Sequence, residues 1–210
     1  MSTSQLPCSP LLFEAVFLRL LADMDGEIHR LPVAFPHERK IREKLIRYLT
    51  LIAAGGYLGT HAKELLNLRW FDIVGKTENS VYEYKTGKSR KVYFAKSFIK
   101  IAERNYKLVD PGNIQYLVLH RLDNPMTPIT TRDFNKNFAL YLKKYHVETQ
   151  NPSSHTLRKT FMNEMWRQGG GDERAYLTVG KMMGYSDKGK VMDYLGHSRK
   201  EIKEEILRIR

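Results

Sequence analysis

Two cationic side chains, His155 and Arg158, lie three positions apart in the stretch SSHTLRKTF. Side chains at i and i+3 share one face of a helix, so both groups would serve the same site. The planar fork of an arginine can hold two phosphate oxygens. Pro152, Ser153 and Ser154 are candidate cap residues that would leave backbone N–H groups near an anion. The pair therefore suggests a phosphate site, although a solvated helix face is the more common explanation of an H-x-x-R pattern.

Two further groups would complete a phosphodiester site that works without a metal. The leaving 5′ oxygen needs a general acid, and covalent catalysis needs a nucleophile such as serine or tyrosine. Lys85 ends an expected strand in the hairpin sequence YKTGKSRKVYF, and Tyr194 lies ten residues after Gly184 in MGYSDKGKVMDYLG. Each signal is weak alone, because basic hairpins are usually surface features and Tyr185 or Tyr194 could simply pack in a core.

The chain carries a formal charge of +12 over 210 residues, with a pI near 9.7. A charge of this size favours a polyanionic partner, nucleic acid before membrane, although a soluble protein can simply run basic. Basic residues close in sequence to the groups above are the candidates for contacts with double-stranded DNA, namely Lys88, Arg90 and Lys159.

The sequence gives no support for a metal site, a disulfide, secretion or a membrane span. Cys8 is the one cysteine, which excludes an intrachain disulfide and a cysteine-based zinc site, and the seven histidines follow no metal-ligand pattern. We therefore expect neither a metal nor a cofactor. The first residues lack the segments of a signal peptide, and no apolar run is long enough to cross a bilayer. The sequence predicts an intracellular, cytoplasmic protein.

The elements that must position these groups form a mainly α protein with a small antiparallel sheet of about three strands. Residues 1–10 are expected to be a loose tail, residues 11–198 one domain, and residues 199–210 a C-terminal amphipathic helix. Helical patterns cover 11–24, 37–57, 61–70, 95–107, 131–147, 155–168 and 172–183. Strand patterns cover 71–74, 80–86 and 90–95.

Glycines mark several of the expected boundaries. The pair Gly55 and Gly56 is expected to close the second helix, and the glycines at 169–171 to end a later one. Gly87 lies in the turn KTGKS between the last two strands, where it is free to take a positive φ.

With these elements in order, the chain resembles the tyrosine recombinases, or phage integrases, over about residues 37–200. The segment GTHAKELLNLRWFDI resembles the family's box I, written G-L-R-x-x-E-L-L-x-L-x-W-x-D-I. The matching residues are Glu64, Leu65, Leu66, Leu68, Trp70, Asp72 and Ile73. By this resemblance, Glu64 is a supporting residue of the site.

Three later segments extend the resemblance. The hairpin places the family's catalytic lysine on Lys85, and HTLRKTF, which resembles box II, places its histidine and second arginine on His155 and Arg158. The segment MMGYSDKGKVMDYL resembles the final L-G-H-S…Y segment, with Tyr185 in the histidine-or-tryptophan position and Tyr194 as nucleophile. A second match, YLGHS, has no tyrosine after it.

The resemblance implies DNA strand exchange without metal or ATP. Tyr194 would attack the scissile phosphate to form a 3′-phosphotyrosine, and a 5′-hydroxyl from a partner strand would reverse the step. Arg158 would hold the phosphate oxygens, Lys85 would protonate the leaving 5′ oxygen, and His155 would bind the phosphate or assist proton transfer at the tyrosine. A free tyrosine has a pKa near 10, so an electropositive pocket must favour the phenolate.

The chain departs from the family pattern at the first position of its catalytic set. Box I should supply an arginine where this chain has His61, and a neutral imidazole offers one donor instead of a fork. In one hypothesis a bound phosphate keeps His61 charged and the enzyme works. In the other the protein is a DNA-binding or regulatory relative. Type IB topoisomerase-like nicking and religation, and a basic helical nucleic-acid binder with accidental matches, are further alternatives.

Length and assembly are the remaining points that the resemblance raises. Only about 35 residues precede the helix that supports box I, too few for the DNA-clamping domain of larger members, so a short natural member and a fragment are both open. In the family the C-terminal region often docks on a neighbour in a tetramer. The stripe of Ile202, Ile206 and Ile209 suits this role or packing on its own domain.

Overall fold

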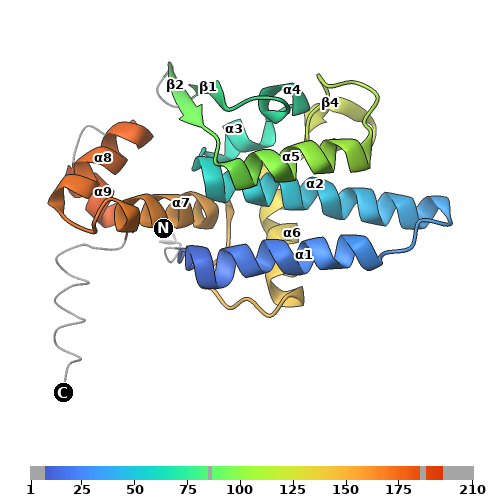
Figure 1. The fold of residues 1–210 in the computed structure, drawn as a ribbon, viewed down its shortest axis with the longest axis horizontal. Coiled ribbons are helices and arrows are strands. Elements are labelled where there is room, and N and C mark those ends of the chain that lie inside the picture. Colours follow the sequence, from blue (N-terminus) through green and yellow to red (C-terminus); the bar gives the residue numbers. More distant parts are fainter. Residues whose placement is uncertain (1–7, 85–86, 185–187, 196–210) are drawn as a thin grey trace, which may run out of the picture.

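The computed structural model describes residues 8–84, 87–184 and 188–195. Within them the chain is mainly helical with two small antiparallel sheets, so the predicted fold class is confirmed (Figure 1). A π-helix, Phe13–Phe17, leads into α1 (Leu18–Arg30), α2 (Pro36–Leu58), α3 (Ala62–Leu66), α4 (Trp70–Ile73), α5 (Lys96–Val109), α6 (Thr131–Lys144), α7 (Ser154–Gln168), α8 (Glu173–Met183) and α9 (Lys188–Leu195). The strands are β1 (Glu78–Glu83), β2 (Lys88–Tyr93), β3 (His120–Arg121) and β4 (Asn124–Pro128).

Helix α2 is the centre of the fold, and its C-terminal half is almost entirely buried. It begins at Pro36, whose fixed φ suits the first helical position. It ends at Leu58, and the next residue, Gly59, takes a left-handed φ of 60° that glycine adopts without steric penalty. Helices α1, α5 and α7 pack against α2, and Figure 1 shows α1 and α5 on opposite sides of it.

Gly55 and Gly56 lie inside α2, so the expectation that they end this helix is wrong. A Cβ on Gly55 would lie 2.6 Å from Cδ1 of Leu157, and a Cβ on Gly56 would overlap the ring of Phe17. Because carbon atoms pack at about 3.5–4.0 Å, any larger residue would force these elements apart. The glycine pair therefore lets α7 and the π-helix approach α2 closely, and it fixes where α7 lies.

The third strand expected in the sheet is absent from the described residues, because most of the segment 71–74 belongs to α4. The Asp72 carboxylate accepts a hydrogen bond from the backbone N–H of Arg69 at 2.9 Å and caps this short turn. Trp70 is fully buried beside it. Capping and burial of one large aromatic side chain thus outweigh the β propensity of the sequence FDIV.

The predicted hairpin is present, and a second hairpin that the sequence did not indicate lies further along the chain. Strands β1 and β2 pair antiparallel with Glu78 opposite Tyr93 and Glu83 opposite Lys88. Gly87 takes the predicted positive φ, 67°. Strands β3 and β4 form the second antiparallel pair, and its register shifts between His120 and Arg121.

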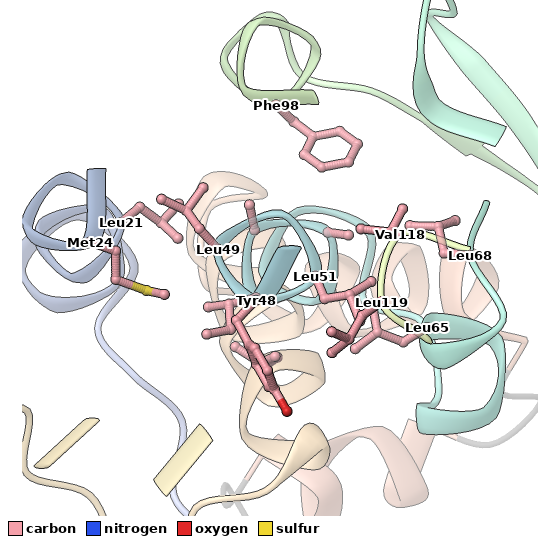
Figure 2. Close-up of a cluster of buried hydrophobic side chains, with 14 of the residues drawn as sticks. Leu21, Met24, Tyr48, Leu49, Leu51, Leu65, Leu68, Phe98, Val118 and Leu119 are labelled. Carbon is pink, nitrogen blue, oxygen red and sulfur yellow. The ribbon is translucent and has the colours of Figure 1, made fainter. Parts of the chain in front are cut away.

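The buried side chains form two clusters. Figure 2 shows part of the larger one, where residues of α1, α2, α3 and α5 meet Val118 and Leu119. The smaller cluster joins α7, α8 and α9 at one end of the molecule and contains Met162, Val179, Met183, Val191 and Leu195. It holds α8 and α9 in place on α7. Within the described part of the chain, no helix is long and apolar enough to cross a membrane.

Candidate active site

The predicted phosphate-binding segment forms the start of α7. Ser153 is the N-cap: its hydroxyl accepts a hydrogen bond from the N–H of His155 at 3.3 Å, and its own N–H donates to Oγ1 of Thr156 at 3.1 Å. This reciprocal pair fixes the first turn of the helix. The side chain of His155 is exposed, whereas Arg158, one turn later, is buried. The two residues thus share a segment but differ sharply in their access to solvent.

Arg158 is only 1% exposed, and backbone carbonyls orient its guanidinium. Nη1 donates to the carbonyl of Gly59, directly after α2. Nη2 donates to the carbonyl of Met183, the last residue of α8, at 3.4 Å. The C-terminal end of a helix leaves carbonyls without helical partners and carries partial negative charge. The arginine therefore joins the ends of α2 and α8 at the start of α7.

Tyr194 on α9 lies directly beside His155 on α7. Its hydroxyl oxygen is 3.0 Å from Nδ1 of His155, within hydrogen-bonding distance. Nζ of Lys159 lies 5.5 Å from the centroid of the tyrosine ring, within cation–π range. Val191 and Leu195 bury the other side of α9 in the smaller core cluster. The structure thus brings the predicted nucleophile, the histidine and one predicted DNA-contacting lysine together.

Glu64 on α3 connects the first hairpin to the helical core. It is 7% exposed, and its Oε1 accepts a hydrogen bond from the backbone N–H of Tyr84 at 3.0 Å. Nζ of Lys63 also lies 3.9 Å from the centroid of the Tyr84 ring. Tyr84 directly precedes Lys85, which lies outside the described residues. Glu64 therefore fixes the backbone at Tyr84, the last described residue before the predicted general acid.

The remaining two basic residues proposed for DNA contact have different environments. Lys88 is exposed on β2. The side chain of Arg90 is 15% exposed and turned inward: its Nε donates to Oε1 of Glu83 at 3.0 Å, and its Nη2 donates to the carbonyl of Leu58 at 3.4 Å. Residues two apart in a strand share one face, and buried Val92 marks the inner face of β2. That alternation is the sequence signal for an inward Arg90, whereas Glu83 belongs to no motif that marks it.

Burial lowers the pKa of the Arg90 guanidinium, because desolvation disfavours the charged form. The hydrogen bond to Glu83 acts in the opposite direction, while the nearby positive charge of Arg158 lowers the pKa further. Two guanidinium groups thus lie near enough to repel each other beside the end of α2.

Comparison with protein-family models places these motifs in one family. The model described as the phage integrase family matches residues 27–201, and this span includes every motif quoted above. The chain belongs to the phage integrase family. Comparison with curated proteins gave no match.

Solved structures of recombinases and integrases share the fold at low sequence identity. The XerH site-specific recombinase in a pre-cleavage complex with difH is 14% identical with a TM-score of 0.65, over 99% of this chain and 56% of that one. The XerA recombinase is 18% identical with a TM-score of 0.64, over 100% and 66%. The catalytic domain of bacteriophage HP1 integrase is 15% identical with a TM-score of 0.51, over 96% and 95%. The chain thus spans between half and two thirds of the two Xer recombinases.

Three further positions of the phage integrase pattern are His61, Tyr185 and Lys85. His61, in the slot of the box I arginine, is partly buried at the N-cap of α3, two residues after Gly59. Tyr185, like Lys85, lies outside the described residues, so its expected place in the site stays a prediction. In the described ranges no group of three or more His, Cys, Asp or Glu side chains is placed to hold a metal ion.

Proposed function

We propose that this chain cuts and rejoins double-stranded DNA through a 3′-phosphotyrosine intermediate on Tyr194, as a site-specific recombinase. The observation that carries the proposal is the 3.0 Å approach of Nδ1 of His155 to the Tyr194 hydroxyl, at the start of the helix that also carries Arg158. A nucleophile within hydrogen-bond reach of a base, next to a fixed cation, is the arrangement that covalent phosphoryl transfer needs.

Each step of this reaction uses a residue of the chain. The Tyr194 oxygen attacks phosphorus, its proton passes to His155, and the bond from phosphorus to the 5′ oxygen breaks. Arg158 stabilises the charge that develops on the non-bridging oxygens. Lys85 gives a proton to the leaving 5′ oxygen, and Glu64 positions the hairpin that carries Lys85. A 5′-hydroxyl from another strand then attacks the phosphotyrosine, which restores the phenol and joins the strands.

The partner of this site is double-stranded DNA, and we propose that copies of the chain assemble on it as a tetramer. The charge of +12 supports a polyanionic partner. Two solved structures support DNA as the partner: XerH is described as bound to its difH substrate, and lambda integrase as a dimer bound to a core site. The lambda integrase match is 13% identical with a TM-score of 0.57, over 93% of this chain and 50% of that one.

A second candidate function is DNA binding without cleavage. His61 favours it, because an imidazole in place of the box I arginine removes one bidentate phosphate donor. The nucleophile and its histidine would then have no use, so their 3.0 Å approach favours the enzyme.

Covalent capture separates the two functions. Duplexes selected from a random library by binding are nicked near candidate phosphates, incubated with the protein and run on a denaturing gel. We expect a protein–DNA adduct that disappears in Tyr194→Phe, while a mobility shift shows binding unchanged. Clear binding with no adduct on any nicked duplex would establish the binding-only function.

A further inference from the structure

Two arginines from different elements meet at the end of α2. Nη2 of Arg90 donates to the carbonyl of Leu58, and Nη1 of Arg158 donates to the carbonyl of Gly59, the next residue. Because consecutive carbonyls orient them, the two guanidinium groups are neighbours in space although one comes from β2 and the other from α7. The end of a helix favours such cations.

The same carbonyls lie just before His61 in the chain. A second guanidinium beside Arg158 is what the family pattern supplies from that position, and an imidazole cannot reproduce its planar fork. Arg90 has the fork that His61 lacks. Its side chain extends from β2 to the end of α2, where its Nη2 meets the carbonyl of Leu58.

We propose that Arg90 is the second guanidinium of the phosphate site and takes over the part of the missing box I arginine. This inference rests on the proposed function, because it names a residue of the same site. Arg90 and Arg158 would each donate to a non-bridging oxygen of the scissile phosphate. The bound anion would relieve the repulsion between the two guanidinium groups, which lie close enough for the charge of one to affect the other.

Glu83 is the positioning partner of Arg90. Its carboxylate accepts the Nε–H of Arg90 at 3.0 Å, and its side chain is only 5% exposed. The other carboxylate oxygen lies 3.4 Å from where a Cβ on Gly184 would be, so Glu83 also abuts the end of α8. That end includes Met183, whose carbonyl orients Arg158. The Glu83 carboxylate therefore contacts both Arg90 on β2 and the end of α8, whose last carbonyl accepts a hydrogen bond from Arg158.

A purely structural role is the competing explanation, in which Arg90 only neutralises buried Glu83. The two roles differ in their response to the charge of the substrate. Replacing one non-bridging oxygen of the scissile phosphate by a methyl group removes the negative charge, so a cation that stabilises this charge is no longer needed. A cation that only holds the fold is needed with either substrate.

The test compares covalent capture by Arg90→Gln on nicked duplexes with a normal phosphate and with a methylphosphonate at the scissile position. On the phosphate we expect a loss of about a hundredfold, the scale for removing one preorganised donor. On the methylphosphonate we expect a rate within a few-fold of the parent protein. An equal loss on both substrates, or no loss on either, would overturn the proposal.

Two controls separate folding and general charge from this effect. The double variant Glu83→Gln, Arg90→Gln leaves no buried carboxylate unpaired by the substitution, and we expect it to show the same substrate dependence. Lys91→Gln removes one positive charge from the neighbouring position of β2, where Lys91 is 58% exposed and pairs with Glu78. We expect Lys91→Gln to cut both substrates like the parent, and a matching substrate-dependent loss there would overturn the proposal.

Tungstate, a tetrahedral dianion, tests the site without any chemistry. In calorimetric titration we expect Arg90→Gln to bind tungstate about tenfold more weakly than the parent and than Lys91→Gln, the effect of one charge-assisted donor. Equal affinity would overturn the proposal. Absence of a covalent adduct in the parent would instead count against the proposed function, and the tungstate result would still decide whether Arg90 binds the anion.

Discussion

Nδ1 of His155 lies 3.0 Å from the hydroxyl oxygen of Tyr194, across 39 positions of sequence. The capped start of α7 fixes the histidine, and the smaller core cluster fixes the helix that carries the tyrosine. The sequence gives only the order of these two motifs along the chain, whereas the structure brings their side chains into contact.

Replacing His155 by glutamine should slow formation of the covalent adduct by about a hundredfold, the lower end of the range for loss of a general base. DNA binding should stay within a few-fold of the parent, because the side chain is exposed and carries no part of the core. Single-turnover capture and mobility shifts measure the two effects. Unchanged capture would show that His155 takes no part in proton transfer.

Replacing Arg158 by alanine should abolish capture and also destabilise the fold. The change removes a buried donor from the carbonyls of Gly59 and Met183, at a cost of about 1–3 kcal/mol in the free energy of unfolding. Denaturant unfolding and capture below the unfolding transition check both parts. Normal cleavage by a folded Arg158→Ala protein would rule out its role as a phosphate clamp.

The change His61→Arg should preserve or raise cleavage at pH 8. At this pH an unperturbed imidazole is neutral, whereas an arginine stays charged and supplies a bidentate donor. Capture rates measured between pH 6 and pH 8 test the change. A large loss at pH 8 would mean that the N-cap position of α3 is shaped for imidazole.

Acid should remove the contribution of Glu164 to stability. Hydrogen bonds from Arg167 hold the pKa of the Glu164 carboxyl below its ordinary value of 4.5, with burial acting in the opposite direction and Gln168 adding to the lowering. A depressed folded-state pKa means that the contribution is complete above the unfolded pKa and is lost as the pH falls through the folded value. At pH 7 the free energy of unfolding of the parent should therefore exceed that of Glu164→Gln by about 1 kcal/mol. This difference should shrink below pH 4.5, and a constant difference in denaturant unfolding from pH 7 to pH 3 would contradict it.

The glycines of α2 give a stability test that is independent of chemistry. Gly56→Ala should destabilise the protein by about 1–3 kcal/mol, because the new methyl group meets the ring of Phe17. The matched control is Gly26→Ala in α1, where the nearest atom to the new methyl is the flexible end of Arg30 at 3.3 Å, and where alanine should stabilise by about 0.5–1 kcal/mol. Equal effects of the two changes would contradict the close packing.

The sequence predicted those features that local pattern determines. The Ser153 cap, the turn at Gly87 and most of the helices depend on neighbours along the chain, and the phage integrase motifs depend on order and spacing. Features that depend on tertiary contact were missed. Gly55 and Gly56 look like a helix end until Leu157 and Phe17 are seen against them, and the sequence FDIV looks like a strand until Trp70 is buried.

Arg90 is the clearest case of the same limit at the site. In sequence it is one of several basic residues in a hairpin, and the sequence predicts only that it contacts DNA, which stays a prediction. Its partners within the protein, Glu83 and the carbonyl of Leu58, lie seven and 32 positions away. Only the pairing of β1 with β2 and the contact of β2 with the end of α2 bring these groups together.

The most direct test of the central claim is to identify the residue that holds the DNA. The covalent adduct is isolated, digested with nuclease and trypsin, and analysed by tandem mass spectrometry. We expect a nucleotide joined through its 3′ phosphate to the peptide that contains Tyr194. A nucleotide on any other side chain, or a 5′ phosphate linkage, would contradict it.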